Sequence, residues 1–299
     1  MSGSPIGARI GANIASRVDS LVDPLDKFVE SHPRLFVLTG AGCSTDSGIP
    51  DYRDSEGEWK RAQPVMFQPF MADAHTRQRY WARSLIGWRY FGRAKPNRAH
   101  LALAELERQG LVELLVTQNV DCLHETAGSH NVVDLHGRLD TVRCMSCEQR
   151  VPRRDFQARL LAENPLWAQL DAREAPDGDA DLEGRDFTTF NVPPCEYCGG
   201  ILKPDVVFFG ESVPRDRVDR AMQGLHEADA MLVVGSSLMV YSGYRFAQAA
   251  AEAGKPIAAV NLGRTRADHL LSLKVSQSCS EALGPLAGAD LRLGFADSV

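Results

Sequence analysis

Four cysteines form two pairs of identical spacing, Cys144-Met-Ser-Cys147 and Cys195-Glu-Tyr-Cys198. Thiolates three positions apart on a tight turn can face one ion, and two such turns supply a tetrahedral shell of four sulfur ligands. The pattern therefore predicts one zinc ion. Because four thiolates leave no coordination position open, we expect the ion to be structural and not catalytic. The alternative is four buried or disulfide-bonded cysteines.

A glycine-rich stretch runs from Gly40 to Arg53. Gly40 and Gly42 directly follow an apolar run, where free backbone amides can approach a pyrophosphate. The stretch is not a G-x-G-x-x-G motif, because the next glycine is Gly48, and no Gly-Lys-Ser/Thr of a P-loop follows. Arg53 could pair with a phosphate or form a surface salt bridge. Taken alone, the stretch leaves nucleotide binding open.

Three further segments carry groups that could do chemistry. Gln118 to Asp121 follows another apolar run, and its amides and carboxylate could bind a carboxamide and a ribose. The alternative is a turn whose polar side chains cap a helix. His136 could act as a general base near pH 7, or serve a structural role. The run from Lys203 to Glu211 could be a core strand, or an exposed edge that accepts a peptide by strand addition.

These groups need elements that position them. The apolar runs 35–38, 111–116, 231–234 and 256–260 lack alternation, which is typical of strands buried on both faces of a parallel sheet. Each run ends in small or polar residues, where open α/β sheets bind ligands. Segments 99–107 and 217–228 have helical composition. The fold class we predict is α/β, a Rossmann-like doubly wound parallel sheet with a smaller inserted zinc-binding module.

The expected domains are residues 1–140 with 203–299 for the Rossmann-like sheet, and 141–202 for the zinc module. Of the 299 residues, 44% are hydrophobic and 24% charged, as in ordinary soluble globular proteins. The net charge of -6 weighs against nonspecific nucleic-acid binding. No apolar run reaches the roughly 18 residues that span a bilayer, and the N-terminus lacks the pattern of a secretory signal. Seven cysteines, four of them paired in spacing, favour a reducing compartment, so we expect a cytoplasmic protein.

Taken together, these motifs resemble the sirtuins, the Sir2 family of NAD-dependent protein-lysine deacylases. The matching segments run in family order over residues 34–285 and include 40–53, 117–121, 135–137, 203–211, 235–237, 261–263 and both cysteine pairs. The sequences of segments 49–53, 78–83 and 240–245 are similar to the class II branch, which contains bacterial proteins and a mitochondrial animal form. The resemblance implies NAD and one structural zinc ion as cofactors. It implies acylated-lysine proteins as substrates, with no specific nucleic acid and no membrane as partner.

The resemblance also implies roles for particular residues. His136 would be the general base, and Asn119 would share the catalytic site. The residues implied for NAD are Gly40, Ala41, Gly42, Ser44, Thr45, Ile49, Pro50, Asp51, Tyr52, Arg53, Gln118, Asn119, Val120, Asp121, Gly235, Ser236, Ser237, Asn261, Leu262, Gly263 and Cys279. The substrate peptide would lie along Val206, Phe208 and Gly210, opposite the segment after Ser237. The zinc ligands would be Cys144, Cys147, Cys195 and Cys198.

Other functions stay open at this point. Transfer of ADP-ribose to a protein is the nearest alternative, because it is also reported in the family. A hydride-transferring oxidoreductase is disfavoured by the missing dinucleotide fingerprint, and a zinc-ribbon nucleic-acid module by the acidic balance. The sequence departs from the family at Cys43, where a larger aliphatic residue is usual, and in the long gap 148–194. Tyr80 and Arg83 have the spacing that selects acidic acyl groups in another sirtuin branch.

Overall fold

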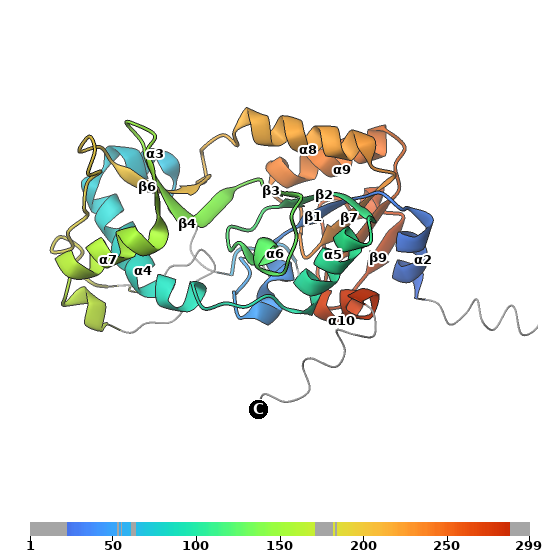
Figure 1. Ribbon diagram of the computed structural model, residues 1–299, viewed down its shortest axis with the longest axis horizontal. Coiled ribbons are helices and arrows are strands. Elements are labelled where there is room, and N and C mark those ends of the chain that lie inside the picture. The colour runs from blue at the N-terminus through green and yellow to red at the C-terminus, as the bar shows by residue number, and fades with distance from the viewer. Residues whose placement is uncertain are drawn as a thin grey trace, which may run out of the picture.

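The computed structural model describes residues 23–52, 54, 56–60, 64–170, 182 and 184–287. The chain forms two lobes that lie next to each other, the larger built on a six-stranded sheet and the smaller on a three-stranded sheet (Figure 1). None of the helices in these residues is long and apolar enough to cross a membrane.

The sheet of the larger lobe is parallel throughout, in the order β3-β2-β1-β7-β8-β9. Its strands are β1 (Leu35–Thr39), β2 (Val112–Thr117), β3 (Val132–Asp134), β7 (Ala230–Val234), β8 (Ile257–Val260) and β9 (Leu273–Val275). Every residue of β1, β7 and β8 is buried, so these strands are covered on both faces. The structure confirms the predicted parallel sheet and the four apolar runs as strands.

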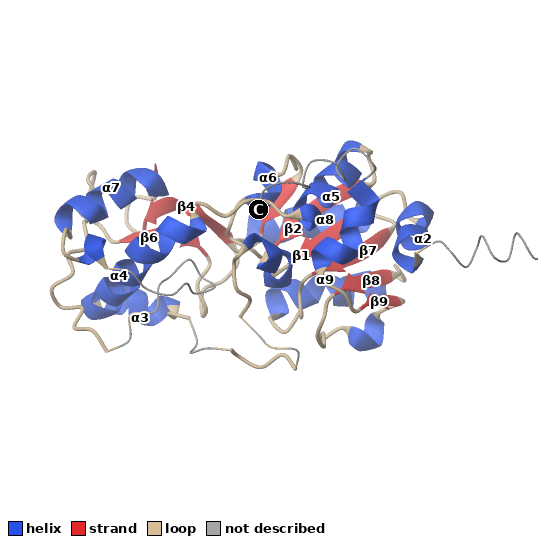
Figure 2. Cartoon of the chain, turned by 90° about the horizontal axis from the view of Figure 1, so that it is seen from below, coloured by secondary structure: helices blue, strands red, loops and turns tan. Residues whose placement is uncertain are grey.

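Helices cover both faces of this sheet, as a doubly wound fold requires (Figure 2). One face packs against α2 (Pro24–Ser31), α5 (Arg98–Arg108) and α10 (Cys279–Leu283). The other packs against α8 (Arg215–Glu227) and α9 (Tyr241–Glu252). The short helix α6 (Leu123–Thr126) follows β2. Short 3-10 turns span Ala41–Cys43, Thr45–Ser47, Trp167–Gln169, Asp268–Leu270 and Gly284–Ala287.

The smaller lobe is an antiparallel sheet with helices packed against it. The strands are β5 (Arg150–Pro152), β4 (Gly137–Cys144) and β6 (Leu202–Val206), in that order. The helices are α3 (Phe67–Ala72), α4 (Ala74–Phe91) and α7 (Arg153–Glu163). Trp81 of α4 is fully buried against Phe156 of α7, and its indole N–H donates to the Leu202 carbonyl over 3.2 Å.

The packing of α3 and α4 bears on the expected domains. The sequence interpretation placed residues 64–91 with the larger sheet and treated 141–202 as one continuous insertion. Trp81 and its neighbours in α4 instead share a core cluster with Cys144 and Phe156. We therefore propose that the smaller lobe consists of two segments, 67–91 and 137–206. The acidic stretch of the expected zinc module lies mostly outside the described residues.

Candidate active site between the two lobes

A cavity of about 870 Å³ is lined by residues of both lobes. The larger lobe contributes loops that follow β1, β2, β7 and β8, at the carboxyl ends of its parallel strands. The smaller lobe contributes the segment that follows β6. Ligands in open α/β sheets bind at this end of the strands, so the cavity is the candidate site.

The floor of the cavity is formed by two glycine loops in backbone contact. The Gly42 amide donates to the Gly235 carbonyl over 2.8 Å. A Cβ atom on Gly40 would lie 2.8 Å from the Cβ of Ser236. A Cβ atom on Gly235, whose φ is +62°, would lie 2.2 Å from the Cys43 amide nitrogen. Only glycine at these positions lets the ends of β1 and β7 approach so closely.

A network of polar side chains joins the end of β2 to the first glycine loop. The Asn119 amide donates to the Gly40 carbonyl over 3.1 Å and to Ser44 Oγ over 3.0 Å. Ser44 Oγ in turn donates to Asp121 Oδ2 over 2.7 Å. Burial raises the pKa of Asp121, and its hydrogen bonds oppose that shift. The network fixes the orientation of Asn119 and Asp121 before any ligand binds.

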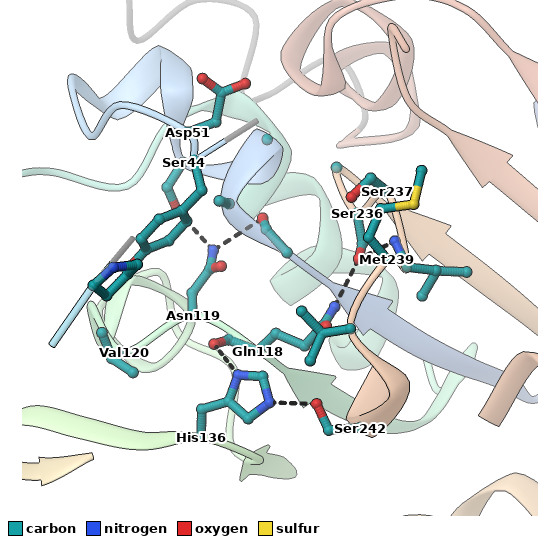
Figure 3. Close-up of a pocket in the computed structure, with 18 of the residues that line it drawn as sticks. Ser44, Asp51, Gln118, Asn119, Val120, His136, Ser236, Ser237, Met239 and Ser242 are labelled. Atoms are coloured by element: carbon teal, nitrogen blue, oxygen red, sulfur yellow. Dashed lines mark hydrogen bonds between the residues drawn. The ribbon is translucent and has the colours of Figure 1, made fainter. Parts of the chain in front are cut away.

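Gln118 connects the same strand end to the second glycine loop. Its side-chain amide donates to Ser236 Oγ over 2.7 Å and to the Thr39 carbonyl over 3.2 Å. Its backbone carbonyl accepts from Nδ1 of His136 over 3.0 Å. Figure 3 shows how Gln118 links Ser236 to His136 across the cavity.

The tautomer of His136 follows from these contacts. A carbonyl oxygen can only accept, so Nδ1 carries the ring proton and Nε2 keeps its lone pair. Ser242 Oγ lies 2.8 Å from Nε2 and donates to it (Figure 3). A histidine with a free Nε2 lone pair directed at a hydroxyl has the arrangement of a general base.

The protonation of His136 differs from the expectation of a group poised near neutrality. The pKa of His136 is lowered to about 4, chiefly by burial and to a lesser extent by the charges of Arg217 and Arg245, while the bond to Gln118 opposes the shift. The imidazole is therefore neutral throughout the physiological range. The unprotonated form that a base needs is always present, at the expense of intrinsic basicity.

The segment after β6 forms the wall that the smaller lobe contributes. Its Val207 amide donates to the His136 carbonyl over 2.8 Å, so it lies directly beside the candidate base. Beneath it, the ammonium of Lys203 is buried and pairs with Glu211 Oε2 at 3.1 Å. Glu211 Oε2 also accepts from the Phe208 amide over 3.0 Å. An ion pair between a buried lysine and a partly buried glutamate thus fixes the turn 208–211.

The predicted site residues converge on this cavity. The lining contains Gly40, Ala41, Gly42, Ser44, Thr45, Ile49, Asp51, Tyr52, Gln118, Asn119, Val120, Asp121, His136, Val206, Phe208, Gly210, Gly235, Ser236, Ser237, Asn261, Leu262, Gly263 and Cys279. Pro50 is not part of the lining, and Arg53 lies outside the described residues. Tyr80 lines the cavity whereas Arg83 does not, so the two do not form a pair facing the cavity.

Among the lining residues that were not predicted as site residues, Ser242 and Arg245 bear most directly on the chemistry. Both lie on α9, one turn apart. The segment 240–245 was noted only for its similarity to the class II branch, and no site role was inferred from it, because a serine and an arginine near a helix N-terminus are common surface residues. Only the pairing of β1 with β7 brings α9 to the side of His136.

The four cysteines meet at one point of the smaller lobe. All four Sγ atoms lie within 4.8 Å of one another. Cys144 and Cys198 are separated by 3.4 Å between sulfurs, and Cys147 and Cys195 by 3.8 Å. Sulfurs about 2.3 Å from a tetrahedral zinc ion lie about 3.8 Å apart, so the spacing fits. The four cysteines are unpaired thiols, which excludes the disulfide alternative.

The two cysteine turns have the same backbone shape. The residue after each pair is in the left-handed region, with φ +63° at Glu148 and +73° at Gly199. The Glu148 amide donates to the Cys144 carbonyl, and the Gly199 amide to the Cys195 carbonyl. Repeating one turn geometry aims both thiol pairs at a single centre, as a structural zinc site requires.

The model of the Sir2 family matches residues 40–242 of this sequence. The chain belongs to the Sir2 family. An NAD-dependent protein deacetylase of Xanthomonas campestris strain 8004 is 69% identical over 259 residues, which cover 87% of this chain and 88% of the relative. NAD-dependent protein deacetylase 2 of Bradyrhizobium diazoefficiens is 68% identical over 259 residues, which cover 87% of this chain and 95% of the relative. Assignment to the class II branch of the family stays a prediction.

Solved Sir2 structures share the fold. A Sir2 complex with a p53 peptide and NAD+ aligns with a TM-score of 0.67 at 30% identity, covering 87% of this chain and 94% of that one. A second, with a deacetylated p53 peptide and 3'-O-acetyl ADP ribose, has a TM-score of 0.68 at 30% identity, with coverage of 86% and 93%.

Proposed function

We propose that this Sir2-family chain is an NAD-dependent protein-lysine deacetylase that releases nicotinamide and O-acyl-ADP-ribose. The observation that carries the proposal is His136, whose Nε2 lone pair accepts from Ser242 Oγ in a cavity that the glycine loops and the wall 206–210 also line. Relatives that are 69% and 68% identical are named as deacetylases of this type. The acyl-lysine substrate is supported by the related Sir2 structures with acetylated and propionylated peptides.

The glycine loops and the polar network are our candidate NAD site. When bound, NAD supplies the ribose carbon that the acyl oxygen of the modified lysine attacks as nicotinamide leaves. The loop 40–45 and the amides of Gln118 and Asn119 would orient the dinucleotide. Their hydrogen bonds are already formed, so little ordering is needed on binding.

His136 would then remove a proton from a ribose hydroxyl through Nε2. The Gln118 carbonyl keeps the proton on Nδ1, which holds the lone pair on the reacting side. The same carbonyl would stabilise the imidazolium once Nε2 is protonated. In the structure Ser242 Oγ occupies the donor position, and the substrate hydroxyl would replace it there.

The acylated peptide would add alongside the segment 206–210, with Val206, Phe208 and Gly210 facing it. The zinc ion would hold the lobe that carries this wall and take no part in the reaction. We also infer a cytoplasmic location, because free thiols and a thiolate zinc site suit a reducing compartment. The net charge of -6 supports a protein partner and no specific nucleic acid.

Acetyl-lysine peptides incubated with NAD test the proposal, with nicotinamide release and peptide mass followed together. With the wild type, the peptide should become lighter by about 42 Da, the mass change for loss of one acetyl group, and one nicotinamide should be released for each peptide deacetylated. His136→Ala should abolish deacylation while zinc content and the circular dichroism spectrum stay unchanged, and the exposed His226→Ala serves as control. Near-normal deacylation by His136→Ala would refute the assignment. Radiolabelled NAD whose label stays on protein would instead support ADP-ribosyl transfer.

A further inference from the structure

Arg245 is a cation in the cavity wall without an anionic partner. Its side chain lines the cavity, and its Nε atom is buried and has no hydrogen-bond partner. Its guanidinium carbon lies 5.2 Å from the ring centroid of Tyr241. With the residues that the structure describes, Arg245 forms no ion pair. The side chain as a whole is only partly buried, but its buried Nε–H has no acceptor, so an anion supplied by a ligand would satisfy it.

The carboxylates that line the cavity cannot serve as this anion, because each already has another partner. Asp51 pairs with Lys60, and Glu211 pairs with Lys203. Asp121 accepts from Ser44 Oγ, and Asp54 accepts from backbone amides of its own turn. Arg245 is thus left available to a ligand.

The position of Arg245 on α9 strengthens the positive potential. Helical side chains point toward the helix N-terminus, and the contact with Tyr241, four residues earlier, places the guanidinium over the first turn. That turn has no capping side chain, since its N-cap is Val240. A cation at the positive end of a helix is unfavourable unless an anion also binds there.

Arg245 also lies close to the proposed chemistry. Ser242 is one turn earlier on the same helix, and its Oγ contacts Nε2 of His136 over 2.8 Å. The helix follows directly on the segment 238–240, which lines the same cavity as the peptide wall 206–210. The glycine loops at the ends of β1 and β7 would hold the NAD diphosphate, whereas Arg245 lies on the helix that begins at Tyr241. The anion is therefore expected on the acyl-lysine substrate.

We propose that Arg245, with the first turn of α9, forms a subsite for a carboxylate carried by the acyl-lysine substrate. This proposal rests on the deacylase function proposed above. The carboxylate could be an acidic side chain next to the lysine or the end of a dicarboxylic acyl chain. Both present the same chemistry to a guanidinium, which binds carboxylates through charge-assisted hydrogen bonds.

Two matched substrate pairs separate these sources. The first pair is an acetyl-lysine peptide with Glu or Gln beside the lysine. The second is a neutral peptide with a glutaryl group or its terminal amide on the lysine. Wild type should show kcat/KM about 10-fold higher for the carboxylate member of one pair, the size of one charge-assisted contact.

Arg245→Gln should equalise the kcat/KM values of the two members of that pair, chiefly through the peptide KM, and should not raise the KM for NAD. Arg245→Lys should retain part of the preference. The control is Arg215→Gln, which removes an equal charge from a side chain that is 94% exposed on α8. Circular dichroism checks that each variant is folded.

Equal kcat/KM within both pairs for the wild type would overturn the proposal. So would an Arg245→Gln variant that raises only the KM for NAD, because the partner would then be a dinucleotide phosphate. Failure of the deacylase function itself has a different signature, since the wild type would then release no nicotinamide with any of the four peptides.

Discussion

The buried histidine His100 makes the stability of this enzyme depend on pH. It lies near the start of α5, is fully buried, and forms a capping box with Asn97, whose amide donates to His100 Nδ1 over 3.3 Å. Burial lowers the pKa of His100 to about 4 from an ordinary value of 6.5. Replacing it by glutamine removes the titration but keeps the capping box, because glutamine is a usual residue at this position.

The sign and size of the effect follow from the two pKa values. The pKa of His100 is lower in the folded state than in the unfolded state. Its contribution to the free energy of unfolding is therefore fully present above pH 6.5 and is lost as the pH falls toward 4. One pKa unit corresponds to about 1.36 kcal/mol, which gives a limit of about 3.4 kcal/mol. At pH 5.5 the unfolded chain is mostly protonated at this residue, and the loss is about 1.4 kcal/mol.

Urea unfolding of the zinc-loaded protein at pH 7.5 and pH 5.5 measures this loss. The decrease in unfolding free energy between the two pH values should be about 1.4 kcal/mol smaller for His100→Gln than for the wild type. His226→Gln changes an exposed histidine and should leave the decrease as it is. If His100→Gln loses as much stability on acidification as the wild type, the buried neutral histidine is not the cause.

Three further outcomes are expected. Removing zinc with a chelator, or changing Cys147 to serine, should lower the melting temperature and abolish the stoichiometry of one zinc per chain; an unchanged melting temperature in metal-free protein would contradict a structural ion. Lys203→Met should leave the partly buried Glu211 without its partner and raise the KM for peptide several-fold with the KM for NAD unchanged, with partial recovery in Lys203→Arg; an equal rise in both constants would argue against an effect confined to the peptide wall. Gly235→Ala should destabilise the fold by at least ~1–3 kcal/mol in urea unfolding, because φ is +62° and the new Cβ would meet the Cys43 amide; wild-type stability would show that the two glycine loops can separate freely.

The larger lobe was predictable because its signals are local. Buried parallel strands appear as continuous apolar runs, and each run ended in the polar residues that now line the cavity. The zinc site was equally local, since each cysteine pair forms its own turn. What the sequence could not supply was how separate segments combine. The aromatic face of α4 would suit either sheet, and only the contact of Trp81 with Phe156 assigns it to the smaller lobe.

The chemistry of the site shows the same division. The type of residue at position 136 was readable, but its tautomer depends on a carbonyl of Gln118 and a hydroxyl of Ser242, which lie 18 and 106 positions away along the chain. Its pKa depends on how completely the two lobes surround it. Such properties come from tertiary packing, and no local pattern encodes them.

The strand order of the larger sheet has a consequence for how the protein is made. β1 lies between β2 and β7, so one edge of β1 stays uncovered until residues 230–234 leave the ribosome. The smaller lobe is complete earlier, once Val206 has been translated. An open strand edge can pair with other chains. We therefore expect nascent chains to depend on chaperones mainly in one interval of translation. It begins when the four cysteines can bind zinc and ends when β7 pairs with β1.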